Sequence, residues 1–167
     1  MESETLNLPV LALRGLTVFP HTNLTFDVER HISMKALEVA METGQEIFLV
    51  TQREINVEKP TEQDLYAIGT ISRVTQILRL GQNSLRVMVE GGRRARLKRL
   101  WQLEPYLQGQ VETAEEPESV NHGPKTEALL RQTWSLFQDY AQLAGNVAEE
   151  VIAAALDCQE PGDLADR

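Results

Sequence analysis

The hydrophobic pattern of this chain changes near residue 113, and the change limits what the chain can fold into. Before this point apolar and polar residues mostly alternate, which is typical of strands that bury one face. After it, apolar residues recur at helical spacing. Charge divides at the same place, because residues 1–112 carry 13 Lys and Arg against 14 Asp and Glu, whereas residues 113–167 carry 3 against 11. The sequence therefore predicts a β domain over residues 1–112, a linker over 113–123 and a helical segment over 124–167.

The β domain is predicted to consist of short strands interrupted by one helix. Leu24, Phe26 and Val28 alternate with polar residues, as in a half-buried strand. Ser33 suits the N-cap of the helix and Gly44 suits its end. Further strands are predicted over residues 8–13, 47–50, 68–80, 85–90, 93–101 and 106–111. Strands and helices do not alternate regularly, so we expect an α+β fold with a mostly antiparallel sheet that curls into a small barrel and thereby removes its edges.

The helical segment carries more apolar surface than it can bury alone. Pro124 suits the first position of one helix, and Asn146 suits the cap of a second. Pro161 starts a third helix, which has little chain left to complete it. The first helix has a wide apolar face made by Leu129, Leu130, Trp134, Phe137, Tyr140 and Ala141. We therefore expect this chain to be a piece of a longer protein, cut within a helical region.

The formal net charge is −9 and there is a single cysteine, Cys158. An acidic chain is poorly suited to broad electrostatic binding of nucleic acid or anionic lipid. One cysteine excludes a disulfide within the chain and fits a reducing compartment. Residues 1–4 lack the basic start of a secretion signal, and no stretch reaches the roughly 18 apolar residues needed to span a bilayer. We expect a cytoplasmic protein that has no membrane partner.

No catalytic motif is visible in the sequence. There is no G-x-x-x-x-G-K-[ST], no G-x-S-x-G, no H-E-x-x-H and no C-x-x-C, and the histidines His21, His31 and His122 are scattered. Only a Ser–Lys pair assembled by the fold would escape such a search. We therefore expect no enzyme activity, metal or cofactor in this chain.

An apolar loop over residues 15–20 is the first candidate binding site. It places Leu16, Val18 and Phe19 between Gly15 and Pro20. If these side chains are exposed, they form a patch able to hold unfolded chain segments or a partner. If they point inward, they close one end of the barrel. We favour the inward arrangement for most of them and keep a substrate-binding patch of Leu16, Val18, Phe19 and Pro20 as the functional hypothesis.

A basic run is the second candidate site. On a strand, Arg94, Arg96 and Lys98 share one face, next to Arg93. Such a face could contact nucleic acid or an acidic peptide. It could also be a solvated face that is balanced by surrounding acids. We favour the second interpretation, because nucleic-acid binding usually comes with a basic domain and aromatic stacking residues, and this domain is nearly neutral.

Several stretches resemble the start of bacterial Lon proteases. The opening Leu8-Pro9-Val10-Leu11-Ala12-Leu13-Arg14-Gly15, followed by Val18-Phe19-Pro20, is similar to the beginning of that family. Further matches in order and spacing are Ala36-Leu37-Glu38 with Ala40-Met41, Ile47-Phe48-Leu49-Val50-Thr51-Gln52, Asp64-Leu65-Tyr66 with Ile68-Gly69-Thr70, Val87-Met88-Val89-Glu90-Gly91 with Arg94-Ala95-Arg96, and Glu160-Pro161 with Leu164-Ala165-Asp166. The turn Gly81-Gln82-Asn83 departs from the commoner Pro-Asp-Gly type. The resemblance covers essentially the whole chain.

The resemblance implies a small PUA-like β pseudo-barrel followed by a helical region, with no catalytic residues. It implies a module that helps to select unfolded or degron-bearing protein substrates and supports hexamer assembly. An ATPase module that uses ATP and Mg, and a Ser–Lys protease module, would lie further along the parent protein. Two other functions stay open, namely a nucleic-acid-binding PUA-like barrel and a stand-alone Lon-domain adaptor protein.

Overall fold

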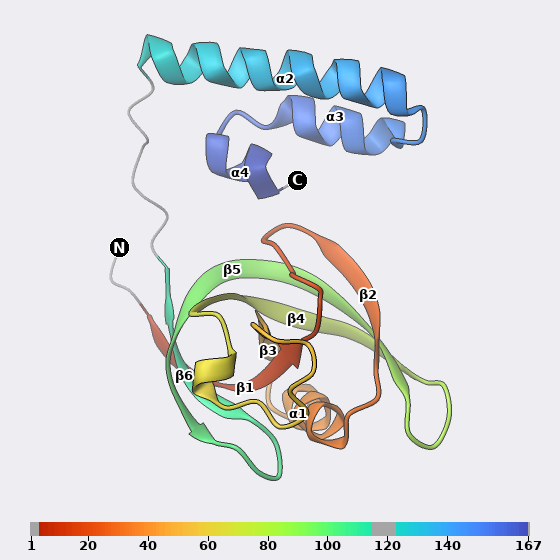
Figure 1. The fold of residues 1–167 in the computed structure, drawn as a ribbon, viewed down its shortest axis with the longest axis vertical. Coiled ribbons are helices and arrows are strands. Elements are labelled where there is room, and N and C mark those ends of the chain that lie inside the picture. Colours follow the sequence, from red (N-terminus) through yellow and green to blue (C-terminus); the bar gives the residue numbers. More distant parts are fainter. Residues whose placement is uncertain (1–3, 115–122, 167) are drawn as a thin grey trace. The chain divides into compact units, whose positions relative to one another are not determined.

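The computed structural model describes residues 4–114 and 123–166, which belong to two compact units, residues 1–115 and 116–167. The division lies close to the predicted end of the β domain at residue 112. The predicted linker over residues 113–123 falls mostly outside the described residues. Each unit is described separately below, and Figure 1 labels their helices and strands.

The first unit is built on one six-stranded sheet with the strand order β2-β5-β4-β3-β1-β6. The strands are β1 (Thr5–Leu13), β2 (Asn23–Val28), β3 (Glu46–Thr51), β4 (Ile68–Arg79), β5 (Leu85–Gln102) and β6 (Gln108–Thr113). Helix α1 (His31–Glu42) follows β2, and a 3-10 turn, η1 (Glu62–Asp64), precedes β4. Of the six pairings between these strands, only β1 with β3 is parallel. The predicted α+β fold with a mostly antiparallel sheet is therefore confirmed.

The sheet closes on itself because β5 is long enough to pair with three strands. Its first part pairs with β2, its second part pairs with β6, and β4 runs along both parts. Strand β6 also pairs with β1, which completes a ring of β1, β3, β4, β5 and β6 (Figure 1). Strand β2 stays outside the ring. The result is an irregular barrel, as expected for a pseudo-barrel.

Strand β5 corrects one prediction, because the expected break between residues 90 and 93 is a bend within a continuous strand of 18 residues. The register with β4 shifts here, as Gly91 lies opposite Ser72 and Arg93 lies opposite Ile71. A Cβ atom on Gly92 would lie 2.7 Å from the carbonyl oxygen of Ile71. The glycines thus let the strand bulge and curl without ending.

The apolar residues of β1 and β3 are divided between two buried clusters, one on each face of the sheet. Leu11, Leu13, Ile47 and Leu49 pack with Leu37 of α1 in the first cluster. Their neighbours in the chain fill the second cluster, which also contains residues of β5 and β6. These are Val10, Ala12, Phe48 and Val50. Burial of both faces explains why residues 8–13 of β1 and 47–50 of β3 are continuously apolar, whereas β2 alternates.

Helix α1 begins two residues before the predicted N-cap. Arg30 occupies the cap position and Ser33 lies buried in the first turn. The carbonyl of Arg30 accepts the first helical bonds, from the amides of Ser33 and Met34, both at 3.0 Å. The guanidinium of Arg30 donates to Gln52 Oε1 at 2.7 Å and to the carbonyl of Ala12. Arg30, which ties the helix start to β1 and to the residue after β3, therefore occupies the cap position expected for Ser33.

The second unit contains α2 (Pro124–Ala144), α3 (Glu149–Asp157) and the short α4 (Pro161–Asp166). Pro124 and Pro161 open their helices as predicted. The cap of α3 is Ala148 and not Asn146, because Gly145 ends α2 in the left-handed region and the chain needs the next residues to turn. No helix within the described residues combines the length and apolar character needed to cross a membrane.

Candidate functional site

The loop between β1 and β2 is held to the barrel by its own backbone. The Thr51 hydroxyl donates to the carbonyl of Leu16 at 2.8 Å, and the buried Thr70 hydroxyl donates to the carbonyl of Val18 at 2.7 Å. The carbonyl of Phe19 accepts from the Thr22 hydroxyl at 2.6 Å. The bonds from Thr51 of β3 and Thr70 of β4 fix the loop to strands that are distant in the sequence, and the bond from Thr22 closes a local turn.

Gly91 allows the loop to lie directly on β5. A Cβ atom at this position would lie 2.0 Å from the carbonyl oxygen of Phe19. The amide of His21 donates to the carbonyl of Gly91 at 2.9 Å, and the amide of Gly91 donates to the carbonyl of Thr22 at 2.8 Å. His21 has a φ of 60°, as expected for the first residue of a β-bulge of this kind. The close approach therefore requires glycine in β5.

The four predicted patch residues divide between the core and the surface. Val18 is buried in the first cluster with 4% exposure, Pro20 is buried, and Leu16 is half-buried against the same cluster. Phe19 is 44% exposed. Of the four predicted patch residues, Phe19 is therefore the one that the loop exposes to solvent.

Two further apolar side chains, Tyr66 and Ile68, extend the surface next to this loop. They are 47% and 41% exposed and line a hollow of about 470 Å³ together with Thr17, Thr51, Arg53 and Ala67. Thr17 belongs to the loop, and its hydroxyl lies 2.9 Å from that of Thr51. We call Thr17, Phe19, Tyr66 and Ile68 the Phe19 surface. Thr17 thus connects the loop that presents Phe19 to a hollow whose apolar side chains lie about 50 positions further along the sequence.

Arg53 places a cation on this surface. Its guanidinium carbon lies 4.9 Å from the centre of the Tyr66 ring, in a cation–π contact. Its Nε atom donates to the carbonyl of Leu65 at 3.1 Å, which holds the side chain in place. The surface is therefore apolar with a fixed positive charge, suited to binding chain segments that contain apolar and aromatic side chains.

Sequence reasoning missed Tyr66, Ile68 and Arg53. These residues are distant from the loop in the sequence, so their position beside it was not evident. That position depends on where β4 begins and on the Thr70 bond to Val18. A signal was present in the sequence. Directly after a polar loop, an aromatic residue, Tyr66, precedes Ala67, and a β-branched residue, Ile68, follows it. Within residues 4–114 and 123–166, no three His, Cys, Asp or Glu side chains gather as they would around a metal ion.

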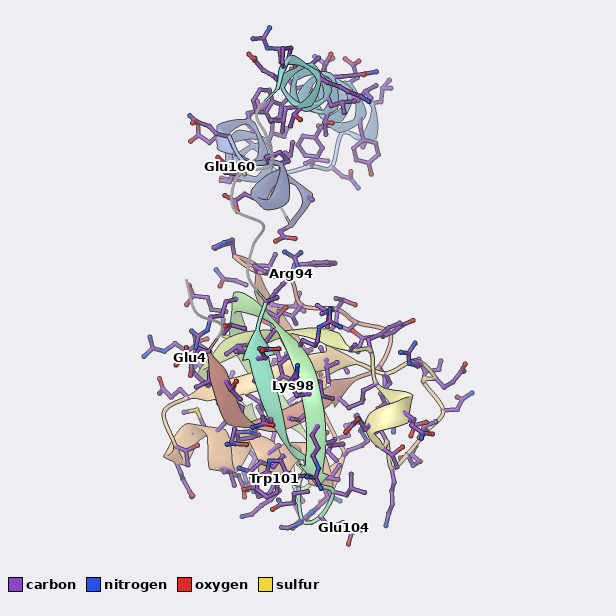
Figure 2. The ribbon with its side chains drawn as sticks, turned by 90° about the vertical axis from the view of Figure 1, so that its left-hand side faces the viewer. Glu4, Arg94, Lys98, Trp101, Glu104 and Glu160 are labelled. Atoms are coloured by element: carbon purple, nitrogen blue, oxygen red, sulfur yellow. The ribbon has the colours of Figure 1, made fainter. Side chains whose placement is uncertain are left out.

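The basic run of β5 lies among carboxylates. Arg93 lies 3.5 Å from Glu4 and 3.6 Å from Glu46, and Lys98 lies 3.0 Å from Glu112 of the neighbouring strand. Figure 2 shows Lys98 where β5 runs beside β6. Arg94 is half-buried and Arg96 is exposed on the same strand. A register shift with β6 lies between Leu97 and Arg99, at Lys98. The ion pairs of Arg93 and Lys98 favour a balanced face over a nucleic-acid contact.

A family model described as the ATP-dependent protease La (LON) substrate-binding domain matches residues 7–167. The chain belongs to this Lon family. The Lon protease of Desulforamulus reducens is 39% identical over 166 residues, which is 99% of this chain and 20% of that protein. Lon protease 1 of Bacillus subtilis is 36% identical over 160 residues, which is 96% of this chain and 20% of that protein. The chain thus spans about 20% of the length of these curated relatives.

Solved structures of Lon N-terminal domains have the same fold. The N-terminal domain of the Mycobacterium avium complex Lon protease matches with a TM-score of 0.73 at 21% identity, covering 96% of this chain and 80% of that one. A Lon N-terminal domain protein from Xanthomonas campestris matches with a TM-score of 0.58 at 19% identity, covering 93% and 92%. The family resemblance in the sequence is therefore confirmed, and so is the fold that it implies.

Proposed function

We propose that this chain is the non-catalytic N-terminal region of a Lon-type ATP-dependent protease, and that its Phe19 surface recognises unfolded or degron-bearing protein substrates. Membership of the substrate-binding domain family supports the role. The observation that carries the location is the 44% exposure of Phe19 on a loop fixed at the carbonyls of Leu16, Val18 and Phe19. Because the backbone that carries Phe19 is already fixed, binding does not have to order the loop.

The remainder of the parent protein completes the proposal. We infer a cytoplasmic serine protease with an ATPase module that uses ATP and Mg, a Ser–Lys catalytic pair and a hexameric assembly. A small apolar area gains little free energy after the entropy of association is subtracted, so one Phe19 surface binds weakly. Six copies in one assembly raise the effective concentration of the remaining surfaces once the first has bound. Weak individual contacts would then suffice to hold a substrate.

The direct test replaces Phe19 by a charged residue. Phe19→Glu should weaken binding of an unfolded protein by about tenfold, because an exposed anchor at the centre of an apolar contact commonly contributes that much. The ligand is a disulfide protein that has been reduced and alkylated so that it stays unfolded, and the readout is fluorescence anisotropy. The same protein with its disulfides intact should not bind.

Leu78→Glu is the matched control. Leu78 is 46% exposed, close to the exposure of Phe19, but it lies near the end of β4, opposite Arg86 of β5, and outside the Phe19 surface. This variant should bind as the original chain does, and both variants should keep the original amide spectrum. Equal losses in the two variants would mean that general surface hydrophobicity drives binding, and would contradict a site at the Phe19 surface.

A further inference from the structure

Strand β2 leaves one edge of the sheet without a partner. It pairs with β5 from Asn23 to Val28, and no other strand among the described residues pairs with its opposite edge. Strand β6, at the other end of the strand order, is closed by its pairing with β5. Figure 1 shows β2 at the margin of the barrel. An unpaired edge presents backbone donors and acceptors that can pair with another extended chain.

The backbone groups that face outward can be identified from the register. The amide of Gly91 donates to the carbonyl of Thr22 at 2.8 Å, and the same register continues with Leu24 opposite Val89. Along an antiparallel strand, the backbone N–H and C=O groups of successive residues point alternately to one neighbouring strand and to the other. The backbone groups of Leu24, Phe26 and Val28 therefore bond to β5. The N–H and C=O groups of Asn23, Thr25 and Asp27 therefore point away from β5. All three residues are exposed.

A groove of about 290 Å³ lies beside this edge. Phe26 and Val28 of β2 line it on one side, and Leu11 and Leu13 of β1 and Leu16 of the loop also line it. A strand added to β2 would direct every second side chain toward the face that carries Phe26 and Val28. Those side chains would enter the groove, and the intervening ones would point to solvent beside Thr25 and Asp27.

Charged side chains of both signs lie around the edge and its groove. Asp27 accepts two bonds from Arg86 of β5, at 2.8 and 3.0 Å, so its carboxylate is held along the sheet. Glu29 is exposed directly after β2, also lines the groove, and forms no ion pair within the described residues. Basic residues at the solvent-facing positions of an added strand would lie beside Asp27, whereas Arg14 and Arg30 line the groove, where that strand would place apolar side chains.

We propose that the free edge of β2 binds an extended segment of unfolded polypeptide as an added antiparallel strand, with apolar side chains at alternate positions in the groove. The proposal rests on the recognition of unfolded substrates proposed above and specifies its mode. Backbone bonds supply affinity that is independent of sequence, and the groove selects alternating apolar residues. Folded proteins have most of their backbone groups already paired, so few of them can add a strand to this edge.

Two N-methylated peptides test the proposal directly. The probe is a fluorescent peptide of about nine residues with alternating Val and Lys, long enough to cover an ordinary strand. With Val in the groove, the Lys amides face β2. Methylation of the Lys amides should weaken binding to the 167-residue chain by about tenfold, while methylation of the Val amides should leave it within about twofold. Equal affinities for the two isomers, or no binding by the unmethylated peptide, would overturn strand addition.

A variant in β2 provides the complementary test. Thr25→Pro removes an outward N–H without removing a bond to β5, a position that edge strands tolerate. Thr25→Val keeps the N–H and a β-branched side chain. The proline variant should bind the unmethylated peptide about tenfold more weakly, and the valine variant should bind as the original chain does. If Thr25→Pro disturbs the amide spectrum, the peptide pair still decides.

The outcomes separate this proposal from the proposed function. Suppose that unfolded protein binds, that Phe19→Glu weakens this binding, and that neither the choice of methylated isomer nor Thr25→Pro changes peptide affinity. Strand addition then fails, while substrate recognition at the Phe19 surface stands. If unfolded protein does not bind at all, both fail. A dimer in sedimentation that Thr25→Pro dissociates would assign the edge to a second copy of the chain and would overturn the proposal.

Discussion

The two units of this protein bury their apolar residues to different extents. In the first unit, both faces of β1 and β3 are buried, and the side chains of Phe48, Leu37 and Ile47 have no exposure. In the second unit, Leu143 is 89% exposed, and Leu136 and Tyr140 are about 60% exposed. The first unit therefore holds a complete core of its own, and its exposed apolar residues stand out as candidates for function. The exposure of leucines in α2 does not by itself indicate a functional surface, because the side chains of the whole second unit are only partly buried.

The largest expected difference between the units comes from removing one phenylalanine. Phe48→Ala should reduce the free energy of unfolding by about 3–5 kcal/mol, because it opens a cavity inside the closed sheet. Phe137→Ala in α2 should cost much less, since Phe137 is half-buried. Urea unfolding followed by amide signals from each unit measures both. Similar losses would mean that the second unit has a core as complete as the first.

Gly91 tests whether the loop that carries Phe19 is fixed by the barrel. Gly91→Ala should destabilise the first unit by about 1–3 kcal/mol and shift the amides of residues 18–22, because the new Cβ would collide with a backbone oxygen. Gly81→Ala is the control, since nothing lies within 4 Å of its Cβ position. Thermal unfolding and an amide spectrum measure the two effects. An unchanged loop in Gly91→Ala would contradict the fixed-loop account.

Acid should weaken the first unit through carboxylates that its fold stabilises. Bonds from the backbone amide and hydroxyl of Thr61 lower the pKa of Asp64, and the bond from Arg86 lowers the pKa of Asp27. A lowered folded-state pKa contributes stability that is present above the ordinary value of 3.8 and is lost as pH falls through the folded value. The urea concentration at the unfolding midpoint of the first unit should therefore decrease as pH falls through this acidic range. Asp64→Asn should reduce that pH dependence, and an unchanged pH dependence would contradict the assignment.

The smallest expected effect lies on α2. Leu143→Lys should change the free energy of unfolding by less than about 0.5 kcal/mol, because the side chain is almost fully exposed. Chemical denaturation of the purified chain measures it, with Ala141→Lys as the contrast, since Ala141 is buried in the same helix. A loss above about 1 kcal/mol in Leu143→Lys would mean that this face of α2 is covered in solution.

The fold could be predicted further than the site. Alternation in β2, continuous apolar runs in β1 and β3, and prolines at the starts of α2 and α4 all reflect local rules that the structure obeys. The cap of α1 escaped prediction because Arg30 acts through Ala12 and Gln52, which are distant in the sequence. The same cause hid Tyr66 and Ile68. Which residue of the loop stays exposed depends on the Thr70 and Gly91 contacts, and no local pattern encodes those.

An amide NMR titration of the whole chain tests the central claim most directly. The ligand is the reduced and alkylated protein, with its folded form as the control. The account predicts localised shifts at residues 15–21 and 66–68 with the unfolded form alone. Shifts confined to α2, around Leu136 and Leu143, would contradict it, because binding would then follow the exposed leucines of the helical unit. The absence of shifts with the unfolded form would also contradict recognition by the Phe19 surface.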